Sequence, residues 1–460
     1  MRRGEMINGT SNHHLRLALA ALASAAVLLL FLDLNLDPGG IAVSGGIEQR
    51  SLPALDYDQF GGAPSRAARD LLTMPRPLRM LTLGGSVTAG SRVEEDETYA
   101  SIVESSFGYE VHNLAIPATG SDYSAECIES MIRSGGIEED IVFDIVTVEF
   151  SINGIAGLDV LLRRLRLRYP DAVIVYVDLY RIKKFQDGQY RDENLRCMKR
   201  VLEAGGGADP KSFSRCADPL VSQSVEEVGG IMYQLPPIFH EDVHGSMAWF
   251  DEDSTHLSKA GHFNVASGIV AVVENEWPSI PDVPRLGSWH GGDQCHSFFR
   301  GQLPEDVELV EGQLTNFNQR TGKFAIEVRM GETARVLFNV DSDETRIAVA
   351  HMITGKPSLY PKVLVSLRNQ DDQPKDMAFS SFKPAEREFY HIQRWMPLQN
   401  VARRGTNVLS ITSLEETELP FRLTGIMMCS VCQSIDKIWN QREIILSADA
   451  ASAQRWRKIQ

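Results

Sequence analysis

The chain has 460 residues, of which 43% are hydrophobic, and this length and composition suit two or three domains with substantial cores. Its formal net charge is −15. An acidic chain without a basic cluster is a poor nucleic-acid binder, so we expect no nucleic-acid partner.

The N-terminal segment has the pattern of a membrane anchor. Residues 1–16 carry three arginines against one glutamate, and the apolar run that starts at residue 17 is interrupted early only by Ser24. With its extension to residue 36, the run reaches roughly the 20 residues that a bilayer requires. This predicts a signal-anchor helix at 17–36, a cytoplasmic N-terminus at 1–16 and a lumenal or extracellular remainder. Cleavage near Ala25, as in a signal peptide, is the alternative.

A stem and then an alternation of strands and helices follow. Residues 37–75 begin with Pro, Gly and Ser and predict a flexible stem. Residues 76–277 contain continuous apolar strands separated by helices, which is typical of a parallel sheet covered on both faces. The polar stretch 183–225 predicts an irregular insertion. Strands are expected at 78–83, 109–115, 145–150, 172–179 and 230–235, and helices at 98–107, 122–133, 158–169 and 258–277.

Beyond residue 277 the periodicity changes. Prolines mark a linker at 278–287, and residues 288–435 contain short alternating or β-branched runs with turn residues between them. Such runs predict an all-β sandwich or jelly-roll-like domain. Its aromatic residues, Trp395 among them, are interpreted as core rather than as platforms for sugars. Residues 436–460 form a polar tail. The expected strands are 323–330, 334–341, 346–353, 362–367, 389–395, 407–412 and 421–428.

The six cysteines suit folding in an oxidising compartment, where some should pair. Cys197 and Cys216 lie close together in one polar segment, so they are the first expected pair. Cys429 and Cys432 have the spacing of a redox or zinc motif. Because no second Cys or His pair at ligand spacing accompanies them, we expect no metal.

The predicted strand 78–83 leads directly into Gly84-Gly85-Ser86. Glycines let a backbone turn sharply, and the serine is then presented at the carboxyl edge of the sheet, where open α/β folds place their sites. By itself, a strand followed by Gly-Gly-Ser is more often only a turn. The segment lacks the Gly-Lys of a P-loop and the second glycine of the α/β-hydrolase elbow, which excludes both motifs.

A serine nucleophile needs a base, and the base needs an orienting group. Asp253-Ser254-Thr255-His256 offers both just before the last predicted helix, since an acid three residues before a histidine can fix the tautomer of its ring. Asp251 remains open as the acid. The rival histidines are His240, His244 and His262, and the last of these is interpreted as a structural residue of the following helix.

Donors for an oxyanion are expected at the ends of the second and third predicted strands. Gly120 can expose its backbone N–H there, and Asn153 can offer its side-chain amide. Asn153 as a helix cap is the alternative interpretation.

The order of these four blocks resembles the SGNH (GDSL-type) hydrolase superfamily: Gly-Gly-Ser-x-Thr-x-Gly, a glycine, an asparagine and Asp-x-x-His. The resemblance covers roughly residues 76–277 and implies a flavodoxin-like three-layer α/β/α sandwich that needs no metal or organic cofactor. By block, it implies Ser86 as the nucleophile, His256 as the base, Asp253 as its partner, and Gly120 and Asn153 as oxyanion donors beside the Ser86 N–H.

Two positions depart from the family pattern. Gly85 stands where an acid commonly precedes the serine, and Gly154 stands where an aspartate often follows the asparagine. Neither position belongs to the triad, so the departures leave the subfamily open and do not exclude catalysis.

We therefore expect a membrane-anchored serine esterase that removes O-acyl groups, O-acetyl included, from a glycan or another substrate of the secretory pathway. One alternative is an O-acyltransferase, in which the same triad passes the acyl group to a sugar hydroxyl. The other alternative is a glycan-binding or adhesion protein with a catalytically idle pocket.

Overall fold

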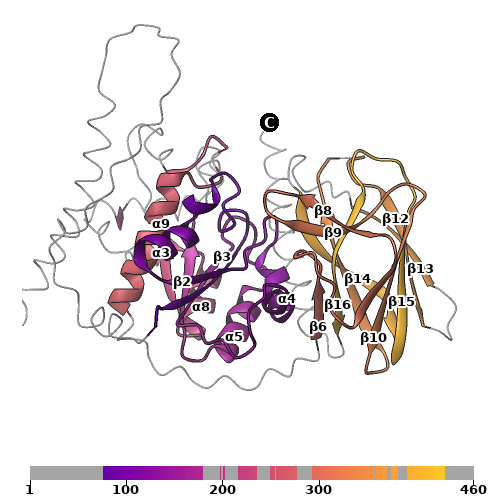
Figure 1. Ribbon diagram of the computed structural model, residues 1–460, viewed down its shortest axis with the longest axis horizontal. Coiled ribbons are helices and arrows are strands. Elements are labelled where there is room, and N and C mark those ends of the chain that lie inside the picture. The colour runs from indigo at the N-terminus through magenta and orange to yellow at the C-terminus, as the bar shows by residue number, and fades with distance from the viewer. Residues whose placement is uncertain are drawn as a thin grey trace, which may run out of the picture.

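Two domains follow one another in the computed structural model (Figure 1). The predicted N-terminus, membrane anchor, stem, linker and tail lie outside the described residues, so these interpretations stay predictions. Among the described helices, none combines the length and apolar character needed to span a bilayer. The structure describes residues 76–179, 197, 200–201, 216–235, 249–253, 255–276, 293–356, 358–369, 375–381 and 391–429.

The first domain is built on a parallel sheet with the strand order β2-β1-β3-β4-β5. Its strands are β1 Arg79–Gly84, β2 Glu110–Asn113, β3 Ile145–Glu149, β4 Val173–Asp178 and β5 Ile231–Gln234. Its helices are α3 Tyr99–Phe107, α4 Ser121–Ser134, α5 Leu158–Arg168, α8 Pro219–Glu227 and α9 Lys259–Glu276.

Helices cover both faces of this sheet because its strands are apolar on both sides. Along β1, Met80 packs into the core shared with α3 and α9, whereas Leu81 and Leu83 pack into the core shared with α4 and α5. The predicted three-layer α/β/α sandwich is thus confirmed. Strand β2 lies on one side of β1, and the next strand, β3, lies on the other side of β1. Such a reversal of strand order opens a crevice at the carboxyl ends of the strands.

The second domain is a β-sandwich, as predicted. One antiparallel sheet has the order β13-β12-β15-β10-β7, and the other has the order β14-β11-β16-β9-β8 with β6 paired to β16. Apolar side chains from both sheets, Phe338 and Phe421 among them, fill the space between them. The strands are β6 Asp293–Ser297, β7 Val307–Glu311, β8 Gln313–Asn318, β9 Lys323–Val328, β10 Thr333–Val340, β11 Thr345–Ile353, β12 Lys362–Asn369, β13 Lys375–Ser380, β14 Ile392–Ala402, β15 Gly405–Ser413 and β16 Phe421–Cys429.

Helix α4 forms the main contact between the two domains (Figure 1). A disulfide joins Cys127 on α4 to Cys295 on β6. Tyr123 in the first turn of α4 stacks on Trp395 of β14, with 5.5 Å between the ring centroids. Buried residues of both domains belong to one apolar cluster, so the core is continuous across the boundary. Trp395 is a core residue, as expected from the sequence.

The cysteine predictions were partly right. The expected disulfide between Cys197 and Cys216 is present. The Cys127–Cys295 bond was not anticipated, because its partners lie 168 residues apart in the sequence. Cys429 is disulfide-bonded rather than free, which suits a structural role in place of a metal ligand.

Candidate active site

The turn that carries Ser86, here called the nucleophile turn, begins at Gly84, the last residue of β1, which pairs with Glu149 of β3. Gly84 has no room for a side chain, since a Cβ there would lie 2.0 Å from Thr88 Oγ1. A Cβ on Gly85 would lie 2.4 Å from Asn153 Cγ. Neither glycine has a positive φ, so close approach of neighbouring groups, and not a special backbone conformation, is the reason for both. This corrects the interpretation that they serve a sharp turn.

Ser86, His256 and Asp253 form one hydrogen-bonded line. The Ser86 Oγ lies 2.8 Å from His256 Nε2, and Asp253 Oδ2 lies 2.5 Å from His256 Nδ1. The other carboxylate oxygen, Oδ1, accepts the backbone N–H groups of Thr255 at 2.8 Å and His256 at 2.9 Å. An antiparallel bridge between Phe250 and Leu257 closes the segment that carries the acid and the histidine.

The hydrogen bonds to Asp253 keep its carboxyl group ionised. Partial burial favours the neutral acid, but the hydrogen bonds from the side chain and backbone of His256 and from the Thr255 N–H outweigh burial and lower the pKa of Asp253. An ionised Asp253 accepts a hydrogen bond from His256 Nδ1–H. His256 Nε2 is then left free to accept the Ser86 hydroxyl proton.

The competing residues have other partners. The Asp251 carboxylate lies 3.8 Å from the Nε of Arg92, which also donates to Asp253 Oδ2 at 3.3 Å, and among the described residues it is Asp253 whose carboxylate meets the imidazole. His262 is buried, and its Nδ1 accepts the Tyr99 N–H at the start of α3 at 3.1 Å. Burial lowers the pKa of His262 to about 3, so it is a neutral structural residue, as interpreted. His240 and His244 lie outside the described residues.

Three hydrogen-bond donors without described partners lie around this turn. Neither the Ser86 N–H nor the Gly120 N–H donates within the described part of the chain, and the same holds for the Asn153 amide. Asn153 lies directly against Gly85, and its buried Oδ1 is also unpartnered there. Asn153 is not a helix cap, because the residue that caps α5 is Gly157. The helix-cap alternative was therefore wrong.

A series of hydrogen bonds between buried side chains supports the nucleophile turn. The Tyr99 hydroxyl donates to Thr88 Oγ1 at 3.1 Å, and the Thr88 hydroxyl donates to Glu149 Oε2 at 3.3 Å. Ser151 donates to the other oxygen of Glu149 at 3.0 Å. These residues were not predicted from the sequence, although Thr88 lies inside the serine block and Glu149 lies in a predicted strand.

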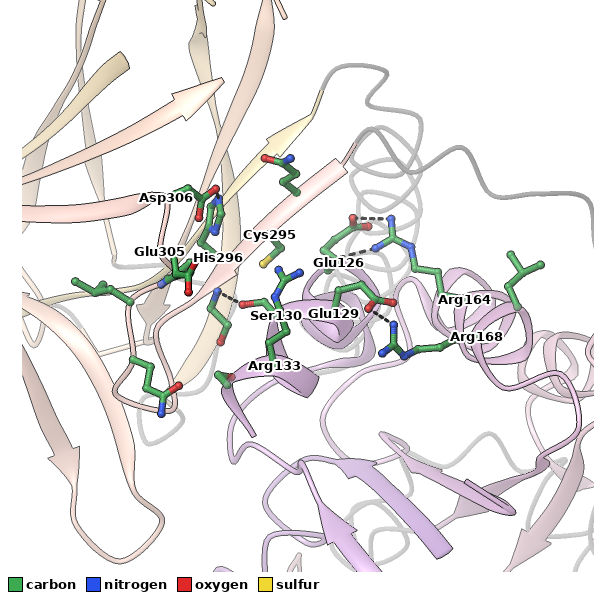
Figure 2. Close-up of a pocket in the computed structure, with 17 residues that line it drawn as sticks. Glu126, Glu129, Ser130, Arg133, Arg164, Arg168, Cys295, His296, Glu305 and Asp306 are labelled. Carbon is green, nitrogen blue, oxygen red and sulfur yellow. Dashed lines mark hydrogen bonds and ion pairs between the residues drawn. The ribbon is translucent and has the colours of Figure 1, made fainter. Parts of the chain in front are cut away.

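The described residues contain no group of three or more His, Cys, Asp or Glu side chains that could hold a metal ion. They do contain a cavity of about 1020 Å³ elsewhere, between α4, α5 and the β6–β7 connection (Figure 2). Its charged lining is largely paired, as in the contacts of Arg164 with Glu126 and of Arg168 with Glu129. None of the triad residues lines it.

Known proteins resemble this chain in structure rather than in sequence. No protein-family model matches it, and no curated protein matches it. The crystal structure of a two-domain esterase active on acetylated mannans, co-crystallised with mannopentaose, is 15% identical with a TM-score of 0.51, covering 79% of this chain and 94% of that one. A second structure of a two-domain esterase active on acetylated mannans is 16% identical with a TM-score of 0.49, covering 76% of this chain and 91% of that one.

At this level of identity the first of these likenesses concerns the fold, and it extends over both domains. The matched part is 79% of this chain, so it includes residues of both the parallel-sheet domain and the β-sandwich. The fold expected from the sequence is therefore confirmed: the chain has a three-layer α/β/α domain followed by a β-sandwich.

Proposed function

We propose that the protein is a carboxylic ester hydrolase that removes O-acyl groups, acetyl included, from a glycan. The observation that carries this proposal is the line of hydrogen bonds from Ser86 through His256 to Asp253 at the carboxyl edge of the sheet. The order of the four sequence blocks and the fold support it.

In the proposed mechanism, Ser86 Oγ attacks the acyl carbonyl while His256 Nε2 takes its proton. Asp253 holds the imidazole in the required tautomer and stabilises the cation that forms. The negative charge on the carbonyl oxygen is met by the N–H groups of Ser86 and Gly120 and by the Asn153 amide. His256 then protonates the leaving alcohol. Water, activated by the same histidine, releases the acyl group from the serine.

The appended domain and the fold support the proposed substrate class. The structural neighbour with the same two-domain arrangement acts on acetylated mannans and was crystallised with mannopentaose. The triad has partial access to solvent, since the side chains of His256 and Asp253 are 19% and 24% exposed. An acyl group that projects from a polymer can reach such a site, and we therefore propose an acylated polysaccharide as the substrate.

The deciding experiment uses the purified full chain. We expect fluorophosphonate labelling and acetate release from acetylated mannan in the wild type, and neither in Ser86→Ala. Ser91→Ala is the matched control, because Ser91 lies in the same turn, where its N–H donates to the Ser86 carbonyl at 3.0 Å. Folded wild-type protein that neither labels nor hydrolyses any ester would favour the binding-protein alternative.

We also propose that the chain is anchored in a membrane through residues 17–36, with the catalytic domain lumenal or extracellular. The length of the apolar run and its arginine flank support this. Alkaline carbonate extraction of expressing cells should leave the chain in the membrane fraction. Recovery in the soluble fraction with a new N-terminus near Ala25 would instead indicate a cleaved signal peptide.

A further inference from the structure

The loop formed by residues 116–120 ends at Gly120, whose N–H the proposed function assigns to the oxyanion. Within the loop, the N–H and the hydroxyl of Thr119 donate to the Ile116 carbonyl at 3.3 and 2.8 Å. Ala118 has a φ of 66°, which lies in the left-handed region that residues with a Cβ seldom adopt. A conformation of this kind persists when the surrounding structure over-determines it.

The β-sandwich supplies that surrounding structure. Lys323 Nζ, at the start of β9, donates to the Pro117 carbonyl at 2.5 Å. The backbone N–H of Gln393, on β14, donates to the next carbonyl, that of Ala118, at 2.8 Å. In the first turn of α4, the Tyr123 hydroxyl donates to Ser297 Oγ at 2.6 Å. The second domain therefore holds the backbone on both sides of Gly120.

A buried lysine is an unusual residue for a hydrogen bond with a purely structural role. Lys323 is only 4% exposed, and its amine lies 5.2 and 5.4 Å from the ring centroids of Phe299 and Phe317. Among the described residues, no carboxylate lies within ion-pair distance of this amine. Burying an amine without a counter-ion costs free energy, and an apolar side chain of similar length would avoid that cost.

We propose that Lys323 is a positioning residue for the esterase reaction. Its amine fixes the Pro117 carbonyl and so, together with the Gln393 N–H, orients the 116–120 loop with the Gly120 N–H toward the oxyanion. The β-sandwich then completes the catalytic site by holding one of its donors, and it is not an independent module. This inference rests on the proposed function.

Two substitutions at this position and one matched control test the proposal. Lys323→Met removes the donor and keeps an unbranched side chain that is one bond shorter. Lys323→Gln keeps an N–H donor on a side chain one bond shorter. Arg300→Met is the control, because Arg300 Nη2 makes a similar bond between the domains, 2.9 Å long, to the Asn113 carbonyl, outside the loop.

We expect Lys323→Met to lower kcat for p-nitrophenyl acetate by about tenfold or more, because a misplaced group near the chemistry is costly. KM should stay within about threefold, since ground-state binding does not use the oxyanion donor. The Tm should be unchanged or higher, because an uncompensated buried amine is removed. Lys323→Gln should retain more of kcat, and Arg300→Met should retain all of it. The rate of fluorophosphonate labelling should follow kcat.

The outcomes separate this inference from the proposed function. An active wild type with equal kcat in whichever Lys323 variants fold would overturn the inference and leave the esterase in place. A lower Tm with unchanged kcat of the folded fraction would also overturn it, because the lysine would then be structural only. Wild-type protein that hydrolyses no ester would overturn both.

Discussion

Gly85 is one of the two positions at which this chain departs from the pattern of the family that it resembles, and its surroundings give the reason. The space that a Cβ would need is taken by the Asn153 amide, which lies 2.4 to 2.6 Å from the ideal Cβ position. The chain therefore keeps Asn153 in direct contact with the backbone that precedes the nucleophile. An acid at position 85 would exclude that contact.

Gly85→Ala is expected to push the Asn153 amide away from Ser86. Because a misplacement of about 1 Å can cost on the order of a hundredfold in rate, we expect turnover to fall by up to that factor. Ester hydrolysis measured beside the control Ser91→Ala checks this. Turnover within a few-fold of the wild type would show that the amide can move without consequence, and would weaken its assignment to the oxyanion.

Asn153→Ala tests the same donor directly. A hydrogen bond used mainly in the transition state should cost on the order of a hundredfold to a thousandfold in kcat when it is removed, with little change in KM. Because Asn153 caps no helix, the Tm should stay close to that of the wild type. Melting temperature and turnover should be measured on one preparation. A lower Tm with normal turnover would remove Asn153 from the catalytic set.

Because of Lys323, we expect the free energy of unfolding to depend on pH. Burial, assisted by the charge of Arg422, lowers the pKa of Lys323 from 10.5 to about 7. Between these two values the unfolded chain binds a proton at this lysine that the folded chain lacks, so this group makes stability rise as pH rises. His391 also faces this site, and its pKa is lowered mainly by burial.

The measurement is denaturant unfolding of the wild type and Lys323→Met between pH 7 and about pH 10. The difference in unfolding free energy should shift in favour of the wild type as pH rises. The comparison with the variant cancels the titration of groups that do not sense Lys323, and the range above pH 7 lies above the lowered pKa of His391. A difference that stays constant with pH would show that the amine keeps its ordinary pKa in the folded protein.

The hydrogen-bonded set of Ser86, His256 and Asp253 could be anticipated from the sequence, because each residue stands at a strand end or before a helix. The roles of Gly120 and Asn153 as oxyanion donors stay predictions. The supporting residues could not be anticipated. Arg92 meets Asp253 across 161 positions, and Thr88 meets Glu149 across 61 positions. No local pattern encodes such pairs, because they exist only after the sheet has brought the segments together.

Helices and strands were predicted most accurately where the apolar runs in the sequence are continuous. The five strands and four of the helices of the first domain lie within about two residues of their expected positions. Helix α8 was missed within the predicted irregular stretch, although Asp218 accepts the Leu220 N–H as its N-cap and Pro219 begins it. The polar composition of the segment suggested an irregular stretch, but the capping residues of α8 are those of a helix start.

In the β-sandwich, the missed strands are those without clear alternation. Strand β6 is a polar segment that pairs with β16 and packs on α4, so its surroundings and not its own pattern make it a strand. Strands β7, β8 and β13 were also missed. β7 and β13 lie at the edge of one sheet and β8 at the edge of the other, where fewer residues are buried on two faces.

At the scale of the whole molecule, the two domains share one apolar core. Residues of β1 and α4 belong to the same buried cluster as Phe299, Trp395 and Met427 of the sandwich. The Cys127–Cys295 disulfide crosses the same boundary. An independent second domain would be expected to meet the first through a smaller and more polar surface. The described part of the chain is therefore expected to unfold as one unit.

Calorimetry of the oxidised protein should show a single unfolding transition, and the double variant Cys127→Ser/Cys295→Ser should lower its midpoint. The bond joins residues 168 positions apart, so its loss removes a constraint on a long loop and should cost about 2–4 kcal/mol. The control is Cys197→Ser/Cys216→Ser, which opens a bond across only 19 positions and should cost less. Two separate transitions in the wild type would contradict a shared core.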